Sequence, residues 1–205
     1  MVKLRIAAIV ASMVALSSVA RAEDITYIFT GVATGSAGAL GFNGVDFNVT
    51  LKGVTANVGP FGTEIQNVPL NATFNIGGVV SGSFTGLSNT VILNPAANII
   101  VFGQNQAGPA FAAEGLANPA FGAYDLTTAF PLNSGTPSFS IQTFQTSPLG
   151  GLSGDTVTFD SISSMSFEAL TAVPELSTWS LMLIGFAGLG WAGYSSAKRR
   201  SASAG

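Results

Sequence analysis

The residues that could carry out chemistry are few and unevenly placed in this sequence. Its 205 residues include ten acidic and seven basic side chains, but no histidine and no cysteine. The chain therefore lacks the usual general base, the usual zinc ligands and any disulfide. A Ser–His or Cys–His nucleophile is excluded. We predict no catalytic residue, no metal site and no cofactor, and we expect the protein not to be an enzyme.

Paired carboxylates are the remaining route to catalysis, because two of them suffice to hydrolyse a glycosidic bond. Asp155 and Asp160 are the nearest pair late in the chain. Their odd separation places them on opposite faces of a strand, which argues against cooperation. Acidic loops can also hold Ca²⁺, but no DxDxDG run occurs. A glycoside hydrolase and a calcium- or polysaccharide-binding module stay open as alternatives to a non-catalytic role.

Charge separates the body of the chain from its two ends. Nine of the ten acids fall within residues 23–173, where Lys52 is the only basic residue. The other six basic residues lie at the two ends of the chain. Such an acidic body repels phosphate backbones, so we expect no nucleic-acid partner.

The body shows the alternation of half-buried β-strands. Ile25, Tyr27 and Phe29 fall on one face of one segment, and residues 47, 49 and 51 do so in another. Many such short segments, separated by glycine and proline, predict an all-β fold over residues 23–172. We expect a β-sandwich of jelly-roll-like architecture.

Two glycine pairs predict hairpin turns within this body. Asn43-Gly44 and Gly77-Gly78 each suit a two-residue turn that needs positive φ. The second turn would place Ile76 opposite Val79. Between prolines, residues 110–116 suggest a helical turn, and residues 121–126 return to strand character.

The first 22 residues have the three-part order of a secretory signal peptide. A short cationic start is followed by an apolar, helical run of 11 residues, Ile6 to Leu16. That run is too short to cross the roughly 30 Å hydrocarbon core of a bilayer. Ala20 and Ala22 supply small residues at positions −3 and −1, so we predict cleavage before Glu23.

A second apolar run near the C-terminus predicts a transmembrane helix over residues 179–197. No charged residue interrupts these 19 positions, and at 1.5 Å per residue they span about 28 Å. Lys198, Arg199 and Arg200 follow at once and act as a stop-transfer signal. The two ends agree on one topology in the cytoplasmic membrane, with the body outside, and residues 201–205 form a disordered tail.

Residues 173–200 resemble the PEP-CTERM sorting segment, which also carries the label of ice-binding protein C-terminal domain. The likeness rests on Pro174 and Glu175, on Trp179 at the start of the span, and on the basic end. Leu176 stands where the family motif has its second proline. The resemblance implies that an exosortase cuts near this motif and passes the protein to the cell surface or exopolysaccharide matrix.

These inferences predict an exported protein of the surface or extracellular matrix with a non-catalytic structural or binding role. Its expected partners are the membrane, through the C-terminal helix, an exosortase as processing enzyme, and exopolysaccharide. We expect it first in the cytoplasmic membrane, and at the cell surface or in the matrix once the tail is cleaved.

Overall fold

The computed structural model describes residues 22–105, 111–138, 142–147 and 156–172, together with residue 182 and residues 185–188. The chain divides into two compact units, Met1–Thr171 and Ala172–Gly205. The strands of the first unit are β1 (Asp24–Ala37), β2 (Leu40–Val54), β3 (Val58–Phe61), β4 (Glu64–Ile76), β5 (Val80–Ser83), β6 (Ser88–Asn94), β7 (Ile99–Asn105), β8 (Phe111–Ala117), β9 (Phe130–Ser138), β10 (Gln142–Gln145) and β11 (Thr156–Thr171). Two short 3₁₀ helices, η2 (Thr55–Asn57) and η3 (Pro119–Ala123), lie between them.

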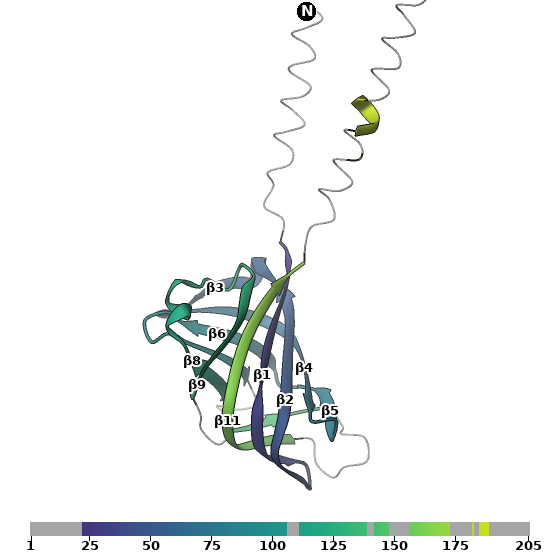
Figure 1. Ribbon diagram of the computed structural model, residues 1–205, viewed down its shortest axis with the longest axis vertical. Coiled ribbons are helices and arrows are strands. Elements are labelled where there is room, and N and C mark those ends of the chain that lie inside the picture. The colour runs from purple at the N-terminus through teal and green to yellow at the C-terminus, as the bar shows by residue number, and fades with distance from the viewer. Residues whose placement is uncertain are drawn as a thin grey trace, which may run out of the picture. The chain divides into compact units, whose positions relative to one another are not determined.

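Eight of these strands form a closed antiparallel barrel (Figure 1). The order around it is β1-β2-β4-β6-β7-β8-β9-β11, and β11 pairs with β1 to close the ring. Strands β3 and β5 add to β4, and β10 adds to β11. The prediction of an all-β fold is confirmed.

The predicted sandwich is replaced by this barrel because β1 and β11 pair along nearly their whole length. Their register runs from Ile25↔Thr171 to Ala37↔Val157. A sandwich would leave the two sheets separate at this point. Long, twisted antiparallel strands can instead coil until their edges meet, which satisfies the backbone groups of both edges.

Aromatic side chains fill the interior of the barrel. The inward positions of β1 are those predicted, and Ile25, Tyr27 and Phe29 are all buried. We call five successive rings the aromatic column: Phe167, Phe29, Phe102, Phe144 and Phe159. Their neighbouring centroids lie 5.0, 5.1, 5.3 and 5.9 Å apart. An eight-stranded barrel is about as wide as its side chains can fill, so this interior is a core.

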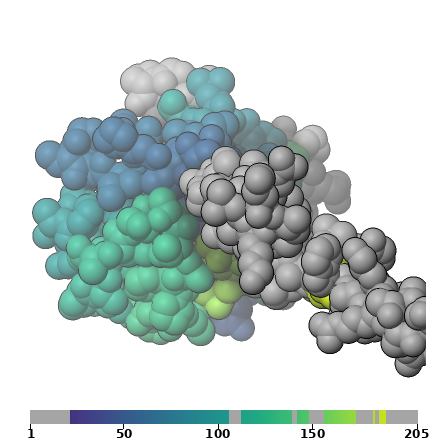
Figure 2. All heavy atoms as spheres, turned by 90° about the horizontal axis from the view of Figure 1, so that it is seen from above, coloured from purple at the N-terminus to yellow at the C-terminus, as the bar shows by residue number. Residues whose placement is uncertain are grey.

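Residues 118–130 cover the end of the barrel next to Tyr27. Phe121 and Leu126 in this segment are fully buried, and the ring of Phe121 contacts Phe167 of the aromatic column. The Tyr27 hydroxyl donates a 2.7 Å hydrogen bond to the Leu126 carbonyl. Figure 2 views the molecule from this end, where the green atoms of this part of the chain lie against the blue atoms of the β2–β4 region.

Both predicted glycine turns differ from the structure. At Gly77-Gly78 the glycines do have positive φ, but Ile76 pairs with Val80, so the turn has three residues and the expected pairing with Val79 is wrong. Gly78 N donates to Asn75 Oδ1 inside this turn.

Asn43-Gly44 is a bulge inside β2, because the β1–β2 turn lies earlier, between Ala37 and Leu40. Thr34 Oγ1 donates to Asn43 Oδ1 and accepts from Gly44 N, which satisfies the bulge.

Residues 111–117 form strand β8, so the predicted helical turn there is wrong. Residues 119–123 form η3, so the predicted strand over 121–126 is also wrong. Asn118 accepts a hydrogen bond from Ala120 N and Pro119 takes the first helical position, which together start a 3₁₀ turn.

In the second unit, Met182 and residues 185–188 are helical and exposed. None of the helical residues that the structure describes belongs to a helix with the length and hydrophobicity of a membrane span. The predicted span, residues 179–197, lies largely outside the described part of the chain. The predicted signal peptide lies outside it except for Ala22.

Candidate functional site

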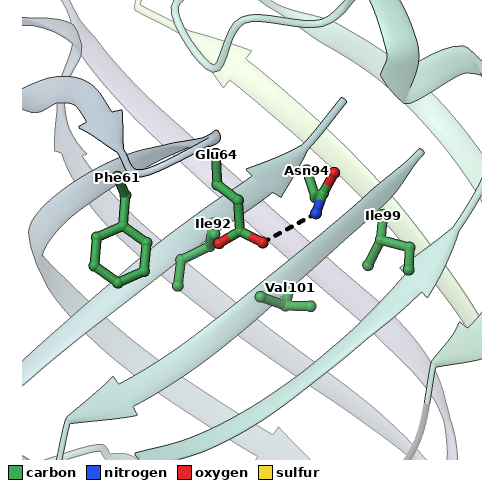
Figure 3. Close-up of a pocket in the computed structure, with 6 residues that line it drawn as sticks. All are labelled: Phe61, Glu64, Ile92, Asn94, Ile99 and Val101. Atoms are coloured by element: carbon green, nitrogen blue, oxygen red, sulfur yellow. Dashed lines mark hydrogen bonds between the residues drawn. The ribbon is translucent and has the colours of Figure 1, made fainter. Parts of the chain in front are cut away.

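The outer face of the barrel is hollowed beside the β3–β4 hairpin (Figure 3). We call this hollow, of about 280 Å³, the hairpin groove. The residues that line it are Phe61, Glu64, Ile92, Asn94, Ile99 and Val101. They come from four strands, β3, β4, β6 and β7.

Strand register brings these side chains together in two rows. In the first row Phe61 pairs with Glu64 across the hairpin, and Asn94 pairs with Ile99. The ladder Ile65↔Leu93 places Glu64 beside Asn94. The second row is Ile92 opposite Val101, one outward position further along.

The hairpin turn sets where Phe61 stands. Only Gly62 and Thr63 separate the paired residues Phe61 and Glu64, and Gly62 has φ of 62°. Glycine adopts this left-handed conformation without the steric cost that other residues incur, so the two-residue turn fits here. The turn leaves the Phe61 side chain 51% exposed at the mouth of the groove.

The polar centre of the groove is the Glu64 carboxylate. Its Oε1 accepts a 3.0 Å hydrogen bond from Asn94 Nδ2. Asn94 is itself oriented, because its Oδ1 accepts from Ala97 N at 2.9 Å. Within the described residues no hydrogen bond or ion pair reaches Glu64 Oε2. This oxygen is therefore an acceptor open to a ligand.

The walls around this carboxylate are apolar. Phe61 faces Glu64 from one side, and the aliphatic side chains of Ile92, Ile99 and Val101 form the floor (Figure 3). A small number of placed polar groups on an apolar surface is typical of sites that bind small organic groups. The groove can thus offer one anionic acceptor and a flat ring to a ligand.

This arrangement suits binding better than hydrolysis. Cleavage of a glycoside commonly needs two carboxyl groups about 5–10 Å apart, and Glu64 is the only one that the described part of the chain places in the groove. The pair considered from sequence does not supply a second, because Asp160 is exposed on β11 and Asp155 lies outside the described residues. Among the described residues no three carboxylates gather as a metal site.

A second glutamate, Glu114 on β8, lies inside the barrel. Its side chain is fully buried opposite Phe102, and both carboxyl oxygens are without a hydrogen-bond partner. Burial raises the pKa of Glu114 from its ordinary value of 4.5 to about 8. The carboxyl is therefore mostly protonated at neutral pH. Because rings fill the core around it, we assign it no ligand.

Two tyrosines hold the covered end of the barrel. Burial raises the pKa of Tyr27 to about 12, against a smaller lowering by its hydrogen bond from Asn67. Burial also raises the pKa of Tyr124, whose hydroxyl donates to the Thr128 carbonyl. Both hydroxyls stay protonated at neutral pH and act as structural donors.

One residue of the predicted export signals lies within the described chain. Ala22 is exposed and lies two residues before the start of β1, and Glu23 between them is tied to Thr55 by hydrogen bonds in both directions. The bond between Ala22 and Glu23 therefore lies at the border of the folded barrel. The remaining signal residues, which are Ala20, Pro174, Glu175, Trp179, Lys198, Arg199 and Arg200, lie outside the described residues.

Sequence reasoning did not find the hairpin groove. The segment from Phe61 to Glu64 does carry a local signal, because glycine stands between an aromatic residue and an acid at hairpin spacing. Nothing in the sequence joins it to Asn94, which is 30 positions further on. That contact depends on the pairing of β4 with β6, a long-range feature.

Comparison with known proteins gives no relative on which to base an assignment. No protein-family model matches the chain, and no curated protein or solved structure matches it.

Proposed function

We propose that this chain is an exported, non-catalytic protein of the cell surface or extracellular matrix, and that its barrel binds a polysaccharide in the hairpin groove. The observation that carries the binding role is the groove itself, which presents an exposed ring and a carboxylate oriented by Asn94. The aromatic column fills the interior, so a ligand must meet the outer face.

Export and retention belong to the same proposal. The N-terminal signal, with Ala20 and Ala22 before the cleavage point, sends the body out of the cytoplasm. The apolar run over 179–197, with Lys198, Arg199 and Arg200 behind it, holds the chain as a transmembrane helix. The sorting motif at Pro174, Glu175 and Trp179 then directs an exosortase to release the body.

The location of Ala22 supports the first cut. It is exposed and lies two residues before the start of β1, so a peptidase can reach it without opening the barrel. Thr171 pairs with Ile25 at the same end of the barrel. Both cuts would thus fall outside the paired strands and leave the barrel whole.

Mass spectrometry of the protein from membrane and medium tests the proposal of export. We expect a mature N-terminus at Glu23 in both fractions, and body peptides in the medium that end near Pro174. Peptides containing residues 179–197 should occur only in the membrane fraction. Recovery of the whole chain, with residues 1–22 attached, from the soluble cytoplasm would overturn the proposal.

A sedimentation assay with insoluble surface polysaccharide from the producing cells tests the binding role. The purified chain should sediment with the polymer, and Phe61→Ala should reduce the bound fraction. Thr63→Ala, on the same hairpin but outside the groove, is the control and should bind as the parent chain does. Equal sedimentation of all three proteins would remove the groove from the proposal.

A further inference from the structure

We infer that the hairpin groove recognises an amino sugar, with the protonated amino group of the sugar on Glu64 and its ring against Phe61. This inference rests on the proposed polysaccharide-binding role and names the chemical class of the ligand. It follows from three properties of the groove: the charge of its polar centre, the apolar character of its walls and the pairing of its floor strands on both sides.

The charge of the groove favours a cationic donor. Glu64 is the only charged side chain among the described residues that line it, and one of its carboxylate oxygens is already held by Asn94. A protonated amine on the open oxygen makes a charge-assisted hydrogen bond, which is about twice as strong as a neutral one. Residues 23–173 carry nine acids and one lysine, so the surrounding field attracts cations and repels uronic acids or sulfated sugars.

The walls favour a compact ring with an apolar face. Phe61 stands 51% exposed at the edge, and Ile92 is almost fully covered in the floor. The C–H face of a pyranose packs on an aromatic ring, and an ammonium group over the face of that ring gains a further cation–π attraction. At about 280 Å³, the groove lies near the lower limit of small-molecule sites, which suits a single sugar unit.

The strand pairing disfavours a basic peptide as the ligand. Extended peptides bind commonly by adding to an open strand edge. The floor of the groove lies on β6 and β7, and each of these strands has partners on both sides: β4 and β7 for β6, and β6 and β8 for β7. A lysine side chain could reach Glu64, but the peptide backbone would find no open edge on the two floor strands.

Titration of the full chain in detergent with soluble oligosaccharides tests the inference. The probes are a glucosamine tetramer, its fully N-acetylated form, a glucose tetramer and a lysine-rich peptide, at a slightly acidic pH that keeps the amines protonated. We expect the glucosamine tetramer to bind most tightly and its affinity to fall with added salt. Glu64→Gln should weaken it by about tenfold or more, the loss expected for one charge-assisted contact.

A matched control separates the groove from general electrostatics. Asp160→Asn removes one negative charge from an exposed position on β11 and should change the affinity by less than about twofold. Glu64→Gln keeps the shape of the side chain, so we expect the barrel to remain folded. Urea unfolding of each variant checks this expectation. Equal losses in the two variants would overturn the inference.

The remaining outcomes distinguish this inference from the proposed function. Equal binding of the glucose and glucosamine tetramers, unaffected by Glu64→Gln, would overturn the amino-sugar assignment and leave polysaccharide binding in place. Tighter binding of the lysine-rich peptide, lost in Glu64→Gln, would replace the sugar by a peptide and overturn both. Absence of binding by every probe would likewise overturn both.

Discussion

At the residue scale, two glutamates show how surroundings decide what a carboxyl group can do. Glu64 lies in an open groove, where Asn94 donates to one oxygen and the other is free for a ligand. Glu114 lies in the core with no partner for either oxygen. A buried charge without a partner is costly, so Glu114 takes up a proton instead of ionising.

This makes the stability of the barrel depend on Glu114 and on pH. The folded pKa is about 8 and the ordinary value is 4.5, so between these pH values the unfolded chain ionises while the folded chain keeps its proton. The stability that the protonated Glu114 contributes to the folded state is fully present below the pKa of the unfolded chain, 4.5. It is lost progressively as the pH rises to the pKa of the folded chain, about 8. The loss is about 1.4 kcal/mol per pH unit, or about 3 kcal/mol by pH 7.

Glu114→Gln should remove this dependence, because glutamine does not titrate. We expect its free energy of unfolding to exceed that of the parent chain by an amount that grows from about pH 5 to pH 8. Urea unfolding at several pH values measures the difference. Glu168→Gln, on the outer face of β11, is the control. A difference between Glu114→Gln and the parent that stays constant with pH would contradict the assignment of this titration to Glu114.

The inward position of Glu114 could not be predicted from its residue type, because acids normally mark the solvent side of a strand. Its neighbours Ala112 and Leu116 are buried on the same face, and they set the phase of β8. By contrast, the inward positions of β1 and β2 were predictable, because Tyr27, Phe29, Val49 and similar large apolar residues recur at every second position of their strands. Alternating apolar residues predict which face of a strand points into the core. They do not reveal a single polar residue, such as Glu114, on that same face.

At the element scale, the strands could be predicted better than their turns. The Gly77-Gly78 segment has the positive φ values expected of it, yet its turn contains Val79 as well. Asn43-Gly44 has the sequence of a turn but lies within β2, where Thr34 supplies the hydrogen bonds that a turn would otherwise make. Local sequence predicts where the backbone needs positive φ, and the partner strand decides whether that place is a turn or a bulge.

The close approach of β1 and β11 requires a glycine at position 31, which lies within a strand and not in a predicted turn. A Cβ at Gly31 would stand 2.2 Å from the Ser164 carbonyl oxygen and 2.8 Å from the Phe47 ring. Gly31→Ala should therefore force the strands apart and destabilise the barrel by about 1–3 kcal/mol. Urea unfolding measures this loss.

Gly59 on β3 is the matched control, because no atom lies within 4 Å of the Cβ that alanine would add there. Gly59→Ala should be neutral or slightly stabilising, since alanine restricts the unfolded chain more than glycine does. If the two variants unfold at the same urea concentration, the close contact between β1 and β11 does not contribute as described.

At the scale of the whole molecule, alternation alone could not distinguish a barrel from a sandwich. Both architectures bury one face of each antiparallel strand, so the same periodicity predicts either. The closure depends on the pairing of β1 with β11, whose residues are more than a hundred positions apart in the chain, as Ile25 and Thr171 illustrate. The sequence supplies no local signal for that pairing.

The closure also places both borders of the barrel together, which leads to the last prediction. Since Ile25 pairs with Thr171, a chain of residues 23–172 contains every strand that the structure describes and every ring of the aromatic column. We expect it to fold alone, with a single cooperative urea transition and a free energy of unfolding within about 0.5 kcal/mol of that of the barrel in the full chain. A control ending at residue 163 loses Met165, Phe167 and Ala169 from the core and opens the β11–β1 seam, so it should not unfold cooperatively. If the 23–172 chain behaved like this control, the barrel would depend on segments beyond its strands, and release of a folded body by cleavage near Pro174 would be contradicted.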